Sequence, residues 1–279
     1  MRVAFLGPAG TFAEEALRAS APAGVEEIPY PSIFEAVMAV QAGAVDRAVV
    51  PIENSIEGSV NATLDALAHE ATGVRIVEEV DHPVHQTLIA ADGVTLADVT
   101  RVMSHPQATA QCQRFIAARL PNAEIVSTPS TAEGVRVVAE ASEPWAAIGP
   151  RLAADLYGGA VLAERIEDHP DNLTRFVWLA PEGTEPTGPA TKTSVVLWGF
   201  NDRSPGALMR VLGEFADREI NLTKIESRPR RMAIGHYMFF VDFEGADGDP
   251  RVGEALGALR ARVEVLRVLG SYPAAVTAM

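Results

Sequence analysis

A hydroxyl and a guanidinium stand side by side at Thr174 and Arg175, between the polar pair Asp171-Asn172 and an apolar run that starts at Phe176. The apolar run is typical of a buried strand, so both side chains are expected at the mouth of a strand, where α/β proteins hold ligands. A threonine hydroxyl can donate a hydrogen bond, and arginine can clamp a carboxylate with two parallel bonds. The simpler alternative is that Thr174 only begins a strand and Arg175 is a solvated charge.

Hydroxyl or amide side chains also stand at or just before the expected N-terminus of three helices: Gly10-Thr11, Asn54-Ser55 and Ser104-His105-Pro106-Gln107. Helix N-termini offer free backbone N–H groups and the positive end of the helix dipole. They bind carboxylates or phosphates without a lysine. Several such ends converging on one cleft predict a site for a small di-anion, with Arg175 as the clamp. Each segment taken singly is also an ordinary helix cap.

Two glutamines, Gln107 and Gln111, are four residues apart, so they share one face of the helix expected after Ser104. We predict that this pair lines the same pocket as Ser104, the alternative being a solvated helix face. Ser104 and Gln107, like Thr11 and Glu14, stand at the spacing of a capping box.

Other kinds of site find little support. Residues 7–10 (Gly-Pro-Ala-Gly) match neither the dinucleotide fingerprint nor the P-loop, and the chain has no Gly-x-Ser-x-Gly elbow. His82 and His85 flank Pro83, which predicts a turn with no third metal ligand nearby. Both lysines follow residue 190, which excludes Schiff-base chemistry before it. We therefore expect neither a cofactor nor a metal.

The composition indicates a cytoplasmic protein. The chain has 279 residues, 48% of them hydrophobic, which is enough for two ordinary domains. Its net charge is −14, and an acidic surface repels nucleic acid. The single cysteine, Cys112, excludes an intramolecular disulfide. Apolar runs are too short for a membrane helix, which takes about 18 residues, and the apolar N-terminus is too short for a signal peptide.

Apolar strands and amphipathic helices alternate over residues 1–180. Strands are expected at 3–6, 46–52, 88–91, 100–103, 124–127, 146–149 and 176–180, and helices near 11–17, 33–40, 60–69, 108–120, 131–141 and after Pro150. This alternation predicts an α/β architecture with largely parallel sheets.

Residues 181–192 are rich in proline and glycine and predict a linker. Beyond it, strands are expected at 194–200, 222–226, 236–243 and 265–270, with helices at 206–218 and 249–262. The order βαββαβ over residues 193–279 is that of a ferredoxin-like domain.

Six segments in order resemble the prephenate dehydratase family with its C-terminal ACT regulatory domain, over essentially the whole chain. They are Gly7-Pro8-Ala9-Gly10-Thr11-Phe12, Val50-Pro51-Ile52-Glu53-Asn54-Ser55, Ser104-His105-Pro106-Gln107, Thr174-Arg175-Phe176, Gly206-Ala207-Leu208 and Glu226-Ser227-Arg228-Pro229. Met209 departs mildly from the leucine or valine of many relatives, a swap that conserves volume.

The resemblance implies a two-lobed periplasmic-binding-protein-like catalytic domain, residues 1–180, with the active site between its lobes. The lobes would be about 1–76 with 168–180, and 77–167. The family's essential threonine maps onto Thr174, and its supporting residues onto Glu53, Asn54, Ser104, Gln107 and Gln111. Gly10, Thr11, Ser55, Arg175 and Phe176 are the expected substrate-binding residues. The chorismate mutase domain fused in some relatives is not expected, since the chain starts at the first strand.

The implied reaction removes the ring carboxylate of prephenate as CO2 and its C4 hydroxyl as water, giving phenylpyruvate for phenylalanine biosynthesis. Aromatisation drives it, so no cofactor is required. We expect Thr174 to donate to the leaving oxygen, with Asn54, Ser104, Gln107 and Gln111 orienting the substrate. Glu53 or a water relay would supply the proton.

In this family the ACT domain binds phenylalanine as a feedback inhibitor at a dimer interface. The implied contacts in this chain are Gly206, Ala207, Leu208, Asn221, Leu222, Glu226, Ser227, Arg228 and Pro229. A homodimer or homotetramer is expected, because ACT pairing is symmetric.

Three other functions are compatible with parts of this pattern. Arogenate dehydratase performs the same elimination on the amino analogue, and nothing in the sequence separates the two. A non-catalytic amino-acid sensor on the same fold would be expected to lack Thr174. A periplasmic solute-binding protein would require an export signal.

Overall fold

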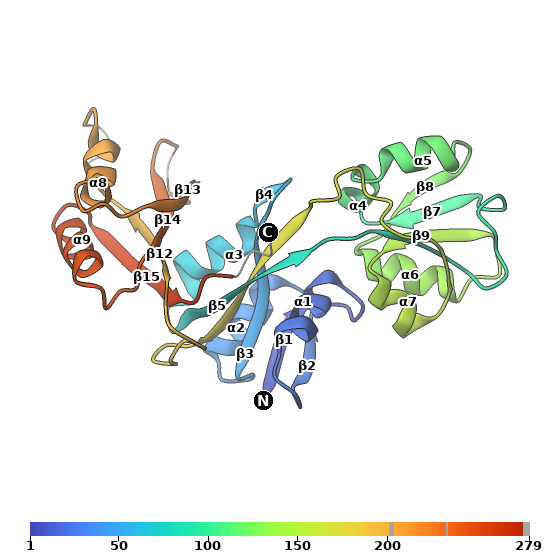
Figure 1. Ribbon diagram of the computed structural model, residues 1–279, viewed down its shortest axis with the longest axis horizontal. Helices are drawn as coiled ribbons and strands as arrows, with labels where there is room; N and C mark the ends of the chain where they lie inside the picture. The colour runs from blue at the N-terminus through green and yellow to red at the C-terminus, as the bar shows by residue number, and fades with distance from the viewer. Residues whose placement is uncertain (201–203, 233, 276–279) are drawn as a thin grey trace.

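The computed structural model describes residues 1–200, 204–232 and 234–275, and it places three β-sheets in a row along the long axis of the molecule (Figure 1). The sheet built mostly from the N-terminal strands lies in the middle and forms the first lobe. A second lobe lies on one side of it and a C-terminal domain on the other. The α/β architecture predicted for the chain is confirmed. The expectation of largely parallel sheets is wrong, because the sheets of both lobes mix parallel and antiparallel pairs.

The first lobe contains a mixed sheet in the order β2-β1-β3-β11-β5, with β4 paired to β3. Its strands are β1 (Arg2–Leu6), β2 (Glu26–Tyr30), β3 (Arg47–Asn54), β4 (Gly58–Ser59), β5 (Val74–Pro83) and β11 (Leu173–Pro181). The helices beside it are α1 (Phe12–Ser20), α2 (Ile33–Gln41) and α3 (Asn61–Asp65), the last continued by one π-helical turn, η1 (Ala66–Glu70). β1 is parallel to β2 and β3, whereas β11 is antiparallel to both of its neighbours.

The second lobe contains a sheet in the order β10-β6-β9-β7-β8. Its strands are β6 (Thr87–Ala90), β7 (Arg101–Ser104), β8 (Glu124–Ser127), β9 (Trp145–Gly149) and β10 (Ala160–Ala163), and its helices are α4 (Pro106–Ala110), α5 (Gln113–Arg119), α6 (Thr131–Ala139) and α7 (Arg151–Tyr157). The chain enters this lobe after β5 and returns to the first sheet at β11, so two neighbouring strands carry both crossovers.

The C-terminal domain has the order β12-α8-β13-β14-α9-β15, as predicted, and its antiparallel sheet runs β13-β14-β12-β15. The elements are β12 (Lys192–Trp198), α8 (Ala207–Ala216), β13 (Leu222–Pro229), β14 (Tyr237–Glu244), α9 (Pro250–Arg260) and β15 (Val265–Tyr272). One face of this sheet packs against α8 and α9 through a core that includes Phe215 and Phe243. Within the described residues, no helix is long and apolar enough to cross a membrane.

The predicted helix starts differ from the structure in detail. The segment expected to form one helix over 108–120 forms α4 and α5, separated at Gln111 and Cys112. His105 caps α4, because its side chain accepts a hydrogen bond from the Gln107 N–H. The capping box predicted for Ser104 and Gln107 is therefore wrong.

The capping box predicted at Thr11 is also wrong, although Thr11 is the N-cap residue of α1. Its hydroxyl donates to the Leu6 carbonyl at 2.9 Å rather than capping the helix. Glu14 is buried, and its carboxylate accepts from the Gly10 N–H at 2.5 Å. Burial raises the pKa of Glu14.

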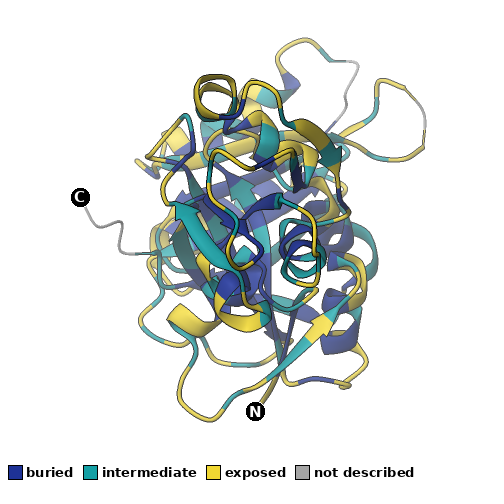
Figure 2. Cartoon of the chain, turned by 90° about the vertical axis from the view of Figure 1, so that its right-hand side faces the viewer, coloured by how far each residue is buried: buried dark blue, intermediate teal, exposed yellow. Residues whose placement is uncertain are grey.

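The second face of the C-terminal sheet shares a hydrophobic core with the first lobe. Met238, Phe240 and Tyr272 are buried there beside Ile76 of β5. The approach is close at Gly270, where a Cβ atom would overlap the Ile76 carbonyl oxygen. In Figure 2 the strands are largely buried, and the exposed residues gather on loops and outer helix faces.

Ion pairs surround this apolar contact. Arg228 of β13 donates to the Asp65 carboxylate of α3 at 2.8 Å, and Arg231 donates to it at 2.9 Å. Burial alone would raise the pKa of Asp65, but hydrogen bonds from the two arginines outweigh burial and lower the pKa below its usual 3.8. A carboxyl whose pKa is depressed in the folded state stabilises that state above its unfolded pKa and loses this contribution as the pH falls.

We therefore expect Asp65→Asn to lower the thermal midpoint at pH 7, corresponding to about 1–2 kcal/mol for charge-assisted bonds at a partly exposed site. The difference between the wild-type protein and the variant should shrink as the pH falls below 3.8. Thermal unfolding measured from pH 7 to pH 3 tests this, and a difference that stays constant over that range would contradict it.

Candidate active site

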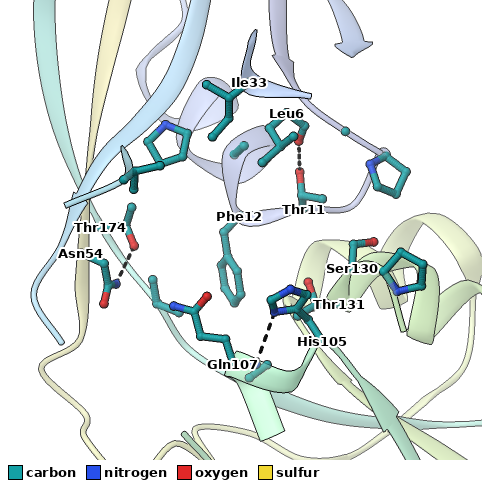
Figure 3. A pocket seen from close by; sticks show the side chains of 18 of the residues that line it. Leu6, Thr11, Phe12, Ile33, Asn54, His105, Gln107, Ser130, Thr131 and Thr174 are labelled. Carbon is teal, nitrogen blue, oxygen red and sulfur yellow. Dashed lines mark hydrogen bonds between the residues drawn. The ribbon is translucent and has the colours of Figure 1, made fainter. Parts of the chain in front are cut away.

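A cavity of about 870 Å³ opens between the two lobes (Figure 3). The first lobe contributes Thr11, Asn54 and Thr174 to its lining, and the second lobe contributes Gln107 and Ser130. These residues lie at the ends of strands or at the starts of helices, so their side chains are positioned by regular backbone. Two parts of the chain that are far apart in sequence are thus brought together around one space.

Thr174 and Asn54 face each other across the β11–β3 pair. The Asn54 amide nitrogen donates to the Thr174 hydroxyl at 2.9 Å and to the Asn172 side-chain oxygen at 2.8 Å. The Asn54 side-chain oxygen accepts from the backbone N–H groups of Ile56 and Glu57, both at 3.0 Å. Asn54 is therefore held on both sides, and because the Thr174 oxygen accepts from it, the Thr174 proton can be donated to a group in the cavity (Figure 3).

A chain of amides continues from Asn54 into the second lobe. Asn172 donates to the Gln111 side-chain oxygen at 3.2 Å, and the Gln111 amide nitrogen donates to Glu57 at 3.5 Å. Gln111 lines the cavity, as does Gln107 one helical turn before it. Both glutamines thus line one cavity, but Ser104, which was expected to share it with them, does not line it.

Of the residues expected to bind substrate, some line the cavity and others lie outside its lining. Thr11 and Phe176 line it. Ser55 holds the backbone instead, since its hydroxyl accepts from the Leu173 N–H at 3.0 Å. Gly10, at φ +82°, packs against Ala153 of α7, where a Cβ would come within 3.1 Å. Gly10 thus allows close contact between the lobes beside the cavity.

Arg175 does not act as a clamp in the cavity, contrary to the prediction. Successive side chains on a strand point to opposite faces, so Arg175 faces away from the side that Thr174 occupies. Its guanidinium bonds Glu79 at 2.6 Å, Asp242 at 2.6 Å and the Tyr272 hydroxyl at 2.8 Å. Burial disfavours its charge, but Tyr272, Asp242 and Glu79 raise the pKa of Arg175 above its ordinary value.

Glu53 and Ser104 are also placed away from the cavity lining. Glu53 precedes Asn54 on β3 and points to the opposite face, where Lys224 lies 2.9 Å from its carboxylate. Ser104 is fully buried, and its hydroxyl donates to the Ile148 carbonyl at 2.6 Å. The predicted proton transfer by Glu53 and substrate contact by Ser104 receive no support from these positions.

Other residues that were not predicted also line the cavity, among them Phe12, Gln86, Ser130 and Thr131. Ser130 caps α6 by accepting from the Glu133 N–H at 3.0 Å, so the N-terminus of α6 faces the cavity. The Ser130–Glu133 spacing is that of a capping box and could have indicated this end. Nothing in the sequence marks Gln86, which is 2% exposed and whose side-chain oxygen has no hydrogen-bond partner among the described residues.

The cavity lining has no lysine or arginine among the described residues, and its one carboxylate belongs to Glu133. Positive potential there comes from backbone dipoles, notably the N-termini of α1 and α6, each a nine-residue helix. Amide and hydroxyl side chains supply further donors. Such a lining can bind an anion by hydrogen bonds without a formal cation.

A second hollow, of about 460 Å³, lies in the C-terminal domain. Its lining includes Gly206, Ala207 and Leu208, three of the residues expected to bind phenylalanine. The other six expected residues do not line this hollow: Asn221, Leu222, Glu226, Ser227, Arg228 and Pro229. Three of them have partners elsewhere in the chain. Asn221 donates to Glu244 at 3.0 Å, Glu226 accepts from Ser59 at 3.2 Å, and Arg228 donates to Asp65 at 2.8 Å.

Two α/β lobes that enclose a cavity and are joined by two crossovers define a protein of the periplasmic-binding-protein kind, to which an ACT-like βαββαβ domain is attached. The family model for prephenate dehydratase matches residues 3–184, and that for the ACT domain matches residues 195–261. The chain belongs to the prephenate dehydratase family.

Individual relatives cover nearly the whole chain. A prephenate dehydratase from Mycolicibacterium vanbaalenii is 44% identical, over 97% of this chain and 90% of that protein. The structure of a prephenate dehydratase from Arthrobacter aurescens in complex with L-Phe has a TM-score of 0.90 at 42% identity, covering 98% of this chain and 90% of that one. GqqA, described as a novel type of quorum quenching acylase, has a TM-score of 0.88 at 31% identity, covering 98% of both chains. The fold therefore occurs with more than one described activity, so the fold alone does not define the function.

Proposed function

We propose that this protein is a carbon–oxygen lyase that converts prephenate to phenylpyruvate, CO2 and water in the cytoplasm, with phenylalanine acting as a regulator at the ACT domain. The observation that carries the proposal is the Thr174 hydroxyl, which Asn54 orients at 2.9 Å on the cavity wall in a member of the prephenate dehydratase family. Residues for the chemistry come from both lobes, so closure of the lobes on substrate would exclude water.

The proposed reaction breaks two bonds. The ring carboxylate leaves as CO2, and the electron pair of its C–C bond completes the aromatic ring as the C4–O bond breaks. The departing hydroxide takes up one proton from solvent and leaves as water, so the elimination consumes one proton. Thr174 donates a hydrogen bond to that oxygen while negative charge develops on it, which stabilises the transition state more than the ground state.

The di-anionic substrate is bound in this proposal by dipoles alone. The cavity lining offers the N-termini of α1 and α6, the Ser130 and Thr131 hydroxyls, and the amides of Gln107 and Gln111. Arg175, Glu53 and Ser104 support the site from outside the cavity rather than touching substrate. A lining without a free cation also leaves the substrate carboxylate weakly stabilised, which favours its loss as CO2.

The hollow lined by Gly206, Ala207 and Leu208 is the proposed phenylalanine site. Support comes from the relative whose structure was determined in complex with L-Phe, at 42% identity. A homodimer or homotetramer is proposed, because the remaining predicted contacts lie outside the hollow in one chain and a second ACT domain would bring more residues to it.

Thr174→Val should lower kcat for prephenate at least about 100-fold, because it removes one hydroxyl donor to the transition state while keeping the shape. Thr174→Ser keeps the donor and should stay within about tenfold of wild type. Steady-state production of phenylpyruvate measures both, with thermal unfolding as the control for folding. Near-wild-type turnover by a folded Thr174→Val protein would refute the assigned role.

Gln86 lines the cavity, and we expect its amide to hold substrate. Gln86→Leu should then raise KM for prephenate about tenfold and change kcat less than threefold, because an amide that only holds substrate contributes to the ground and transition states alike. Leucine has a similar volume and removes a buried oxygen with no partner, so the thermal midpoint should not fall. An unchanged KM in a stably folded variant would show that Gln86 does not contact substrate.

The proposed function itself is tested by incubating the purified protein with prephenate, with arogenate and with an N-acyl homoserine lactone, each with and without phenylalanine. We expect turnover of prephenate that phenylalanine suppresses. Faster turnover of arogenate would replace the substrate by its amino analogue, and release of a fatty acid alone would favour an acylase such as GqqA. Calorimetry with phenylalanine on the same preparation separates loss of regulation from loss of activity.

A further inference from the structure

A cluster of buried charges joins the ACT domain to the first lobe on the side of the sheet opposite the cavity. Arg175 lies at its centre, bonded to Glu79 of β5 and to Asp242 and Tyr272 of the ACT sheet at 2.6–2.8 Å. Lys192 of β12 bonds the second Glu79 oxygen at 2.5 Å. Arg175 also lies 3.4 Å from the Glu53 carboxylate, which pairs with Lys224 at 2.9 Å. Three cations thus meet three carboxylates, so the cluster is neutral, which lowers the cost of burying it.

The ACT side of the cluster is itself tightly held. Ser194 donates to the Asp242 carboxylate at 2.5 Å and lies 2.5 Å from the Tyr272 hydroxyl. Tyr272 is fully buried, and burial raises its pKa, so it stays a neutral phenol. Asp242 and Tyr272 come from two strands of a rigid sheet and therefore hold the guanidinium in one orientation.

Arg175 directly follows Thr174 on β11, and on the adjacent strand β3 Glu53 directly precedes Asn54. Thr174 pairs with Asn54 and Arg175 pairs with Glu53 in the register of β11 and β3. Asn54 and Thr174 face the cavity, whereas Glu53 bonds Lys224 of the ACT domain at 2.9 Å. Both strands that carry the cavity pair are thus fixed to the ACT domain one residue away.

We propose that Asp242 and Tyr272 of the ACT domain, acting through Arg175, are positioning residues for the Thr174 hydroxyl. This inference rests on the proposed function. The guanidinium fork sets the backbone position and rotation of β11 at residue 175, and the strand transmits that setting to residue 174 on the opposite face. The ACT domain then forms part of the catalytic apparatus even without a regulator bound.

The test compares kcat and KM for prephenate in full-length Tyr272→Phe, Asp242→Asn and a matched control, Asp65→Asn. The control breaks another ion pair between the first lobe and the ACT domain, far along the chain from Thr174. Tyr272→Phe keeps the aromatic ring and removes only the hydroxyl, so it tests the idea even where Asp242→Asn fails to fold. The Tyr272→Phe change is also made in the Thr174→Val background.

Tyr272→Phe should lower kcat about tenfold and leave KM within about twofold, as expected for a loss of alignment in the transition state. Asp65→Asn should leave kcat within about twofold even though its thermal midpoint falls. In the Thr174→Val background the same Tyr272→Phe change should alter kcat less than twofold, because the group that it positions is absent.

Unchanged kcat in folded Tyr272→Phe would overturn the inference, as would an equal loss in Asp65→Asn, which would indicate general loosening of the interface. A full tenfold loss in the Thr174→Val background would also overturn it, because Tyr272 would then act by another route. Absence of turnover by the wild-type protein would refute the proposed function, and this inference with it.

Discussion

The pairing of β11 with its two antiparallel neighbours is the constraint on which the rest of the structure depends. The register puts Thr174 opposite Asn54 on one side and His82 on the other. Because side chains alternate along a strand, a slip of one residue would turn Thr174 away from the cavity and bring Arg175 into it. The apolar residues that follow, such as Val177 and Leu179, are fully buried and prevent that slip. The position of the cavity hydroxyl is thus fixed by hydrophobic burial several residues away.

The same strand decides how an acidic protein can hold a di-anion. A free arginine in the cavity would bind carboxylate strongly, but here the nearest arginine on β11 is turned to the opposite face and neutralised by Glu79 and Asp242. The cavity is left with helix ends, amides and hydroxyls. Fixed dipoles do not reorganise during a reaction, and they do not compensate a carboxylate as fully as an ion pair does. That balance suits a reaction in which one carboxylate has to leave.

Much of this site could be predicted from residue types and spacing, because Thr174, Asn54, Gln107 and Gln111 combine polar chemistry with positions at element ends. The errors have one physical origin. Glu53, Ser104 and Arg175 adjoin the correct residues, but which face of a sheet becomes a cavity wall depends on what packs on the other face, and local spacing does not contain that information. Gln86 could not be predicted for the same reason, because no local pattern shows that it faces the cavity. Ser130 was not predicted, although its spacing from Glu133 is that of a capping box.

The α/β order of the lobes and the βαββαβ order of the ACT domain were predictable because each follows from local periodicity. The contact between them was not, since it combines a shared apolar core with the close approach of Gly270 to the Ile76 backbone and a buried group of opposite charges. Buried ion pairs add little net stability compared with apolar packing of the same volume. What a guanidinium held by two carboxylates and a phenol does add is a single orientation. On the face of the first sheet opposite the cavity, this cluster fixes the orientation of Arg175 more closely than an apolar interface would. Arg175 lies on β11, the strand that carries Thr174 on the cavity side.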